Sequence, residues 1–228
     1  MSRKAAIYHF TDKGIQRPGV CRNQLQALKA FALSKGFDVE EVFCDTSILR
    51  HERVEFDRFL SFCEDFDALI VKDFRHINKN TGQCVEVLQE LLNKGIVVLT
   101  MENGIIRFEE EPLGRPLRVA TYNSRFGTPS ELKQIVPVQN EVLRLFTSKK
   151  TAWKVIDQYF DETEHQANGE QKNLENLINN RERYDLLLVH TLNDIHWRTS
   201  NFFRIRERLK LDIYSLQDGY LKYTQEAA

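Results

Sequence analysis

The sequence has few of the residues that mark metal, redox or membrane proteins. Its four cysteines lie far apart and form no CxxC pair, which argues against a zinc or dithiol site and fits reduced thiols in a cytosolic protein. No Gly-rich phosphate loop is present. The opening MSRKAAIYHF is basic and then only briefly apolar, too short for a signal peptide or membrane helix. We therefore expect a cytoplasmic protein without metal or cofactor.

The chain also lacks an excess of either charge. Lys and Arg number 32, Asp and Glu number 33, and the formal net charge is -1. Proteins that mainly grip a duplex are more often basic, because phosphate contacts need Lys and Arg. Non-specific DNA binding is therefore not expected as the sole activity. What the chain does have is core material, with 42% hydrophobic and 11% aromatic residues.

One stretch, DALIVKDFRHINKN (residues 67–80), has the form of a sheet strand with a polar edge. Its apolar run, residues 68–71, is too short for a helix and indicates a buried strand of a parallel sheet. Polar residues follow at once, including Lys72, Asp73, Arg75 and His76. Ligands bind at the carboxyl ends of such strands, so a small-ligand or nucleotide sensor using Lys72 and Arg75 is one open alternative.

Strand and helix patterns alternate through the first half. We expect strands at 5–10, 37–44, 68–71 and 96–101, and helices at 22–35, 54–63 and 81–93. Residues 11–19 and 45–53 are expected to be loops. Gly36 and Gly95 are placed to end two of the helices. The predicted fold class is α/β, with a mainly parallel sheet of about four or five strands flanked by helices.

The second half repeats the first. Tyr122 follows Tyr8 by 114 positions, Asp161 follows Asp45 by 116, and the run DLLLV (185–189) follows DALIV (67–71) by 118. We expect two tandem domains, 1–113 and 114–228, with the boundary near Leu113 in a linker rich in Gly and Pro. A helix should end at Ser148, with Pro137 in its first turn or with an extra turn that begins at 128–131.

The order of these motifs resembles the catalytic domain of serine recombinases of the resolvase/invertase type. The resemblance covers about the first hundred residues. It rests on the leading IY strand, the QLQALKAFA helix ending in Gly, FCD at the end of the second strand, Arg53, DALIVKDFRH and GIVVLTMENG. Each motif is weak alone, and their succession is more specific. The resemblance implies two degenerate tandem copies of that domain.

In this family a serine just after the first strand attacks a DNA phosphate, and arginines stabilise the charge that develops. The corresponding run here is Tyr8 to Asp12. Asp12 stands at the serine position without gaps, and a two-residue deletion would bring in Thr11 as the residue after the serine. Thr11 and Asp12 are thus the weak nucleophile candidates of the first copy. Arg53 and Arg75 match phosphate-binding arginines, and Lys72 adds a third positive charge.

The second copy departs further from the family. Ser124 and Arg125 stand two places early and in reversed order, and Gln171 and Asn193 replace Arg53 and Arg75. Two local patterns have competing interpretations. The group of His190, Asp194 and His196 could ligate zinc but is expected to be ordinary loop polarity, and Arg204 with Arg208 is expected to be a solvated helix face rather than a nucleic-acid patch.

Our hypothesis is a catalytically degenerate resolvase-like protein of mobile-element or phage origin that acts by binding. Its partner would be a recombinase, another protein or a second copy of itself, with DNA as a weaker candidate and no membrane. The alternative is an active site-specific DNA recombinase with an unusual nucleophile. The missing serine and arginines favour the first, because losing the nucleophile removes the covalent route altogether.

Overall fold

The computed structural model describes residues 3–12, 18–47, 53–102, 104–105, 115–126, 129–163 and 171–223. The chain divides into two compact units. The first comprises residues 1–79 and 83–106, and the second comprises residues 107–228 together with 80–82. The predicted boundary near Leu113 lies outside the described residues, so the division into domains 1–113 and 114–228 stays a prediction.

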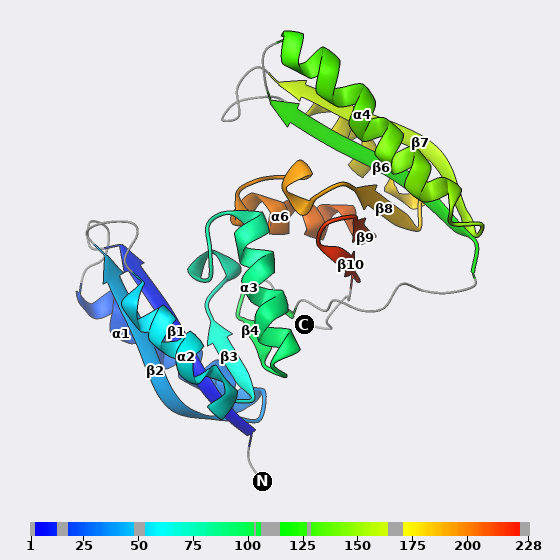
Figure 1. The fold of residues 1–228 in the computed structure, drawn as a ribbon. Coiled ribbons are helices and arrows are strands. Elements are labelled where there is room, and N and C mark those ends of the chain that lie inside the picture. The colour runs from blue at the N-terminus through cyan, green and yellow to red at the C-terminus, as the bar shows by residue number, and fades with distance from the viewer. Residues whose placement is uncertain are drawn as a thin grey trace. The chain divides into compact units, whose positions relative to one another are not determined.

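The first unit is built on a five-stranded sheet of order β2-β1-β3-β4-β5. Its strands are β1 (Arg3–Asp12), β2 (Phe37–Ser47), β3 (Ala68–Val71), β4 (Val97–Thr100) and β5 (Gly104–Ile105). β1 to β4 run parallel, and only the edge strand β5 is antiparallel. All four side chains of β3 are buried, as expected for an apolar run covered on both faces of a sheet. The predicted α/β class is confirmed (Figure 1).

Helices cover both faces of this sheet. They are α1 (Pro18–Ser34), α2 (Val54–Phe62) and α3 (Thr81–Asn93), with short 3-10 turns η1 (Cys63–Asp65) and η2 (Phe74–His76). α1 buries Leu28 and Ala32 in a cluster with Ala5 and Ile7 of β1. Alternate β1 residues point to the other face, where the Tyr8 ring lies 4.6 Å from the Phe56 ring of α2.

The second unit repeats this strand order. Its sheet runs β7-β6-β8-β9-β10, with β6 (Leu117–Phe126), β7 (Trp153–Thr163), β8 (Leu186–Val189), β9 (Asp212–Ser215) and β10 (Gly219–Leu221). Only β10 is antiparallel. The helices are α4 (Pro129–Ser148), α5 (Lys172–Asn179) and α6 (Thr199–Leu209), with 3-10 turns η3 (Arg181–Arg183) and η4 (Leu192–Asp194). Figure 1 shows α4 lying along β6 and β7.

The registers of the two sheets also correspond. Ala5 pairs with both Val39 and Ala68, and Val119, 114 positions later, pairs with both Val155 and Leu186. The β1–β2 register shifts directly after Ala5, and the β6–β7 register shifts directly after Val119. A shared irregularity at one position is a more specific likeness than a shared strand order, because a bulge changes which residues face each other.

Several predicted boundaries were wrong. β1 runs on through Asp12 and β2 through Ser47, because the two strands keep pairing beyond their apolar residues. α1 begins at Pro18, where a proline suits the first helical turn. α4 begins at Pro129, so Pro137 lies inside the helix instead of in its first turn. The alternative start at 128–131 is the one that the structure bears out. No helix in the described ranges is long and apolar enough to cross a membrane.

The two predicted helix stops at glycine are confirmed. Gly36 and Gly95 follow α1 and α3 with φ of 78° and 80°, in the left-handed region that glycine adopts without strain. In the second unit the same task after α6 falls to Lys210, which has a φ of 52°. A non-glycine residue there carries a steric cost that the surrounding fold must offset.

Candidate functional site

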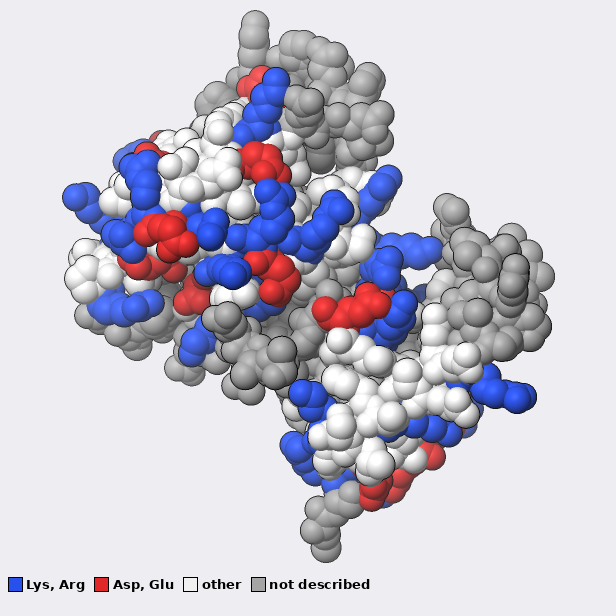
Figure 2. All heavy atoms as spheres, turned by 180° about the vertical axis from the view of Figure 1, so that it is seen from behind, with Lys and Arg blue, Asp and Glu red and all other residues white. Residues whose placement is uncertain are grey.

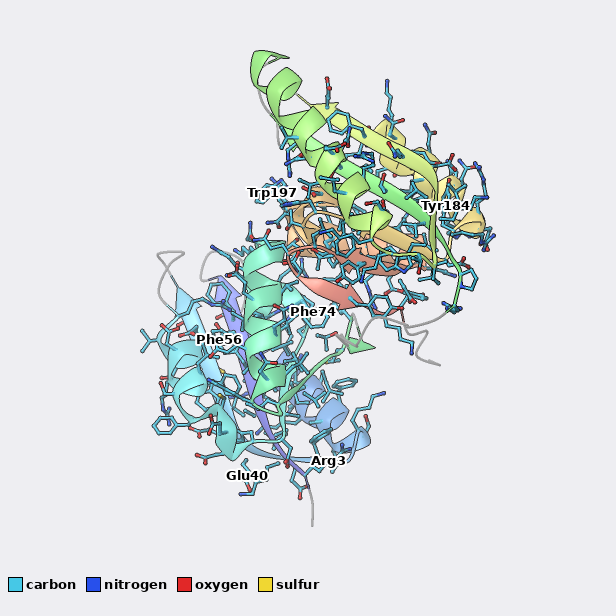
Figure 3. The ribbon with its side chains drawn as sticks, turned by 45° about the vertical axis from the view of Figure 1, so that its right-hand side comes forward. Arg3, Glu40, Phe56, Phe74, Tyr184 and Trp197 are labelled. Atoms are coloured by element: carbon cyan, nitrogen blue, oxygen red, sulfur yellow. The ribbon has the colours of Figure 1, made fainter. Side chains whose placement is uncertain are left out.

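The candidate site lies at the carboxyl ends of β1, β2 and β3 in the first unit. Since these three strands are parallel and adjacent, their carboxyl ends meet at one edge of the sheet. Thr11 lies near the end of β1, Asp45 lies near the end of β2, and Lys72 and Asp73 follow β3. Figure 3 shows the side chains around Phe56 of α2 and Phe74 of η2, which belong to the elements that complete this edge.

A buried carboxylate fixes the start of α2. Asp45 is 6% exposed and accepts hydrogen bonds from the backbone N–H groups of Glu55 and Phe56, both at 3.0 Å. It also accepts one from the Tyr8 hydroxyl at 3.1 Å. A negative charge at a helix N-terminus satisfies N–H groups that have no partner inside the helix. Burial raises the pKa of Tyr8, although the charge of Arg53 opposes the rise.

The guanidinium of Arg53 is engaged on all three of its nitrogens. Nε donates to the Tyr8 hydroxyl at 3.2 Å, and the two terminal nitrogens donate to the backbone carbonyls of Ile77 and His76. The Phe56 ring lies 4.5 Å from the guanidinium carbon. Arg53 thus ties β1 and α2 to the loop that follows η2. Arg53, which was predicted to bind phosphate, therefore uses three of its five N–H donors within the protein in this conformation.

Arg75 forms a two-pronged ion pair with Asp73. Its Nε and one terminal nitrogen lie 2.8 and 2.7 Å from the two carboxylate oxygens. The carboxylate also caps η2 by accepting from the Arg75 backbone N–H. Burial of Asp73 disfavours its charge, but hydrogen bonds from Arg75 and His76 outweigh this and hold its pKa well below the usual range. The Arg75 side chain stays 49% exposed, so part of it faces solvent.

The remaining predicted residues differ in how they are placed. Lys72 forms an ion pair with Glu102 at 3.2 Å. Thr11 is 6% exposed, so its hydroxyl is not displayed on the surface. Asp12 ends β1 and pairs through its backbone with Ser47, and its side chain lies outside the described residues. The sheet edge therefore gathers the predicted positive charges and gives each of them an acidic or carbonyl partner.

His9 is a feature of this edge that the sequence did not single out. It is 1% exposed, and its ring stacks on His76 with centroids 5.5 Å apart. Neither ring nitrogen has a hydrogen-bond partner among the described residues. Burial, together with the nearby charges of His76 and Lys72, lowers the pKa of His9 to about 4. No sequence signal separates such a histidine from an ordinary strand residue.

The second unit holds the start of its second helix, α5, in the same way as the first, by a tyrosine hydroxyl and a buried aspartate. We call this arrangement the Tyr–Asp frame, and in the second unit it contains no arginine. Asp161 accepts from the N–H groups of Asn173 and Leu174, both at 2.9 Å, and from the Tyr122 hydroxyl at 3.0 Å. Gln171 then donates to the Tyr122 hydroxyl at 3.2 Å and to the Ile195 carbonyl at 3.0 Å. These are the counterparts of two of the bonds made by Arg53. A neutral amide therefore performs in this unit what the guanidinium performs in the first.

The other polar residues of the second edge are turned inward. Asp194 is 1% exposed, forms an ion pair with Arg125 and takes part with Thr191 in the capping box of η4. Burial raises the pKa of Asp194 despite the charge of Arg125. Ser124 is 2% exposed. In the described ranges no three His, Cys, Asp or Glu side chains are grouped to hold a metal ion, and the Asp194 of the zinc alternative is committed to Arg125.

The basic residues of α6 contact different partners. Arg208 forks onto Glu175 of α5, with distances of 2.8 and 2.5 Å, and Arg204 donates to Asn201 at 3.2 Å. Arg206, which the sequence did not single out, is 2% exposed and donates to the Lys222 carbonyl at 3.0 Å. Basic and acidic side chains are interspersed on the face that Figure 2 shows. These contacts do not gather Arg204 and Arg208 into a nucleic-acid patch.

Comparison with protein families gives one match. Residues 13–121 match the family "Resolvase, N terminal domain". This segment is therefore similar to a resolvase domain. The match covers just under half of the chain, and it begins after β1, so Thr11 and Asp12 lie outside it. No curated protein matches the sequence.

Solved structures of serine recombinases are among those that the chain resembles. The N-terminal catalytic domain of TP901-1 integrase is 18% identical with a TM-score of 0.40, over 45% of this chain and 80% of that one. A resolvase family site-specific recombinase from Streptococcus pneumoniae is 17% identical with a TM-score of 0.38, over 65% of this chain and 95% of that one. Likenesses at these levels say nothing about activity or substrate.

Proposed function

We propose that this chain is a catalytically degenerate resolvase-like protein that acts in the cytoplasm by binding a protein partner in DNA recombination. The proposal rests on the contacts that the two arginines predicted to bind phosphate make within the protein. Arg53 is engaged by Tyr8 and two backbone carbonyls, and Arg75 is engaged by Asp73. A clamp arginine has to offer its donors to the phosphate oxygens, because the developing charge is what it stabilises.

The nucleophile supports the same proposal. The only hydroxyl among the predicted candidates, Thr11, is buried, and the run that should carry the serine lies outside the matched segment. A carboxylate at the Asp12 position would repel a phosphate. A phosphoserine-type intermediate needs an exposed hydroxyl within reach of the phosphate, and the buried Thr11 does not offer one.

We further propose that residues 114–228 form a second, more degenerate copy of the domain in residues 1–113. The shared strand order, the shared register shift and the shared Tyr–Asp frame support this. The exchange of Arg53 for Gln171 supports loss of catalysis as well. Gln171 makes the counterparts of two Arg53 hydrogen bonds, so the contacts of Arg53 fit a structural role that involves no phosphate.

The test is covalent trapping on DNA. The wild-type chain is incubated with suicide substrates carrying nicked recombination sites, beside an active serine recombinase as the positive control. We expect an adduct with the control and none with this chain. An adduct mapped to Thr11, Asp12 or Ser124 would overturn the proposal in favour of an active recombinase with an unusual nucleophile. In that case Arg75→Ala should abolish the adduct.

Direct binding is measured separately. Affinity purification from the source cell, with and without nuclease, distinguishes a protein partner from an association bridged by DNA. We expect the association to survive nuclease treatment. For DNA itself, Lys72→Ala and Arg75→Ala are compared with Arg58→Ala, whose guanidinium pairs with Glu41 and Glu55. Equal, weak and salt-sensitive binding by all three agrees with the proposal, and selective loss with the first two contradicts it.

A further inference from the structure

The outer face of α4 carries a row of exposed apolar side chains. Val138, Val142 and Leu145 are 62%, 38% and 47% exposed. Their spacing of four and three residues places them on one side of the helix. Leu143 and Thr147, on another side, are buried. Single exposed apolar residues are ordinary, but a contiguous row on one helix face marks an interaction surface. We call these three residues the α4 stripe.

The first unit shows that the fold does not need this stripe. Gln139, Leu143 and Phe146 of α4 follow Gln24, Leu28 and Phe31 of α1 by 115 positions, and Leu28 and Leu143 are both buried. The same offset sets the α4 stripe against Asn23, Ala27 and Ala30. At these three outer positions, large apolar side chains thus replace small or polar ones. Packing against the sheet does not explain them, because it uses the other side of the helix.

The charges beside the stripe indicate what covers it. Glu141 and Arg144 form an exposed pair within the helix, with side chains 50% and 60% exposed and a closest distance of 2.6 Å. The two charges have opposite sign, and one precedes and the other follows Val142 in the sequence. If a second α4 lies antiparallel across a two-fold axis at Val142, Val138 meets the second copy's Leu145. Glu141 then meets the second copy's Arg144, and the reciprocal pair forms as well.

We propose that α4 docks against α4 of a second copy of this chain, antiparallel, through the α4 stripe and two reciprocal Glu141–Arg144 ion pairs. Apolar side chains meet apolar side chains and opposite charges meet across the axis. The surface is therefore complementary to itself, as a two-fold interface requires. This deepens the proposed binding role by naming one partner and its surface. It does not depend on the loss of catalysis, and the trapping experiment above leaves it untouched.

The first test removes the stripe. Sedimentation equilibrium of the full chain is measured over a range of concentrations for the wild type and for a triple variant, Val138→Asn, Val142→Ala and Leu145→Ala. The variant carries the residues that the first unit has at these positions. We expect a concentration-dependent dimer for the wild type and a dimer Kd at least about tenfold higher for the variant, since buried apolar area is lost. Leu33→Ala, which removes a 69% exposed leucine from α1, is the control and should change nothing.

The second test uses charge exchange and identifies the occupant. Glu141→Arg and Arg144→Glu should each weaken self-association, because like charges then meet across the axis. An equimolar mixture of the two variants should associate again, since one presents two arginines on this face and the other presents two glutamates. Circular dichroism checks that each variant keeps the helix content of the wild type. A wild type that stays monomeric throughout, a stripe variant that dimerises unchanged, or a mixture that fails to associate would each overturn the proposal.

Discussion

The two units hold the start of their second helix with the same frame but a different charge. In the first, the Tyr8 hydroxyl donates to Asp45 and accepts a hydrogen bond from Arg53. In the second, the Tyr122 hydroxyl donates to Asp161 and accepts one from Gln171. Both donors reach the tyrosine hydroxyl and a backbone carbonyl beyond the 3-10 turn. The difference teaches that the frame needs a hydrogen-bond donor at this position. It does not need a positive charge.

The caps of the 3-10 turns after β3 and β8 also differ in residue type while keeping the same hydrogen bond. Asp73 caps η2 and Thr191 caps η4, each by accepting a backbone N–H two residues on. Any small side chain with an oxygen can do this, so the residue type is free to change while the turn stays. The first unit adds Arg75 to the cap, and the second adds a buried Asp194–Arg125 pair. Fold geometry is common to the units, and surface chemistry is not.

The largest effect should come from the carboxylates that both units share. Asp45→Ala and Asp161→Ala each leave a tyrosine hydroxyl and two helix N–H groups without their acceptor. We expect each to lower the free energy of unfolding of its own unit by about 4 kcal/mol. Hydrogen exchange of its backbone amides measures the free energy of unfolding of the first unit. Fluorescence reports the second, because both tryptophans, Trp153 and Trp197, lie there. A loss below about 1 kcal/mol in either unit would break the comparison.

A pH effect should arise at one position of β1 and not at the corresponding position of β6. The folded pKa of His9 is about 4, below the value of about 6.5 for a free histidine, so the unfolded chain binds a proton that the folded unit does not. Stability from this group is therefore complete above pH 6.5 and is lost as the pH falls toward 4, by about 3 kcal/mol. Asn123 occupies the corresponding place in the second unit and does not titrate.

The exchange His9→Asn should remove that pH dependence from the first unit. Hydrogen exchange of β1 amides between pH 6.5 and 4 measures it, with His196→Asn as the control. His196 also has a pKa lowered by burial, but it lies in the second unit. An unchanged pH slope in the first unit would show that His9 is not the group responsible.

A smaller effect is expected from the donor exchange itself. Arg53→Ala leaves the Tyr8 hydroxyl and two carbonyls without their donor and should cost about 3 kcal/mol. Arg53→Gln copies the second unit and keeps two of the three bonds, so it should cost about 1 kcal/mol. Chemical denaturation followed by hydrogen exchange compares them. If both variants lose the same stability, the charge matters and the correspondence between the units fails.

The smallest effect should come from surface ion pairs that the units do not share. Arg208 and Glu175 are 47% and 52% exposed in their side chains, so solvent screens their attraction. Arg208→Ala should change the stability of the second unit by less than about 0.5 kcal/mol, measured by tryptophan fluorescence during urea unfolding. A loss above about 2 kcal/mol would mean that this pair belongs to the structural frame.

Much of the fold could be predicted because the main strands are short apolar runs. ALIV and LLLV mark β3 and β8 unambiguously, and the glycines after α1 and α3 end those helices as expected. Strand ends were predicted less well, since β1 and β2 continue through polar residues by pairing with each other. α4 was predicted too short, because Pro137 is tolerated inside a helix that its other residues stabilise.

The candidate site could be located from the sequence, but its chemistry could not. The sequence by itself determined the α/β class, the repeated pattern of the two halves and the edge where Arg53, Arg75 and Lys72 gather. Local composition and spacing decide these features. Only the tertiary structure decided what those charges do. The partners of Arg53 lie 45, 24 and 23 positions away, and folding alone brings such distant groups within hydrogen-bond distance.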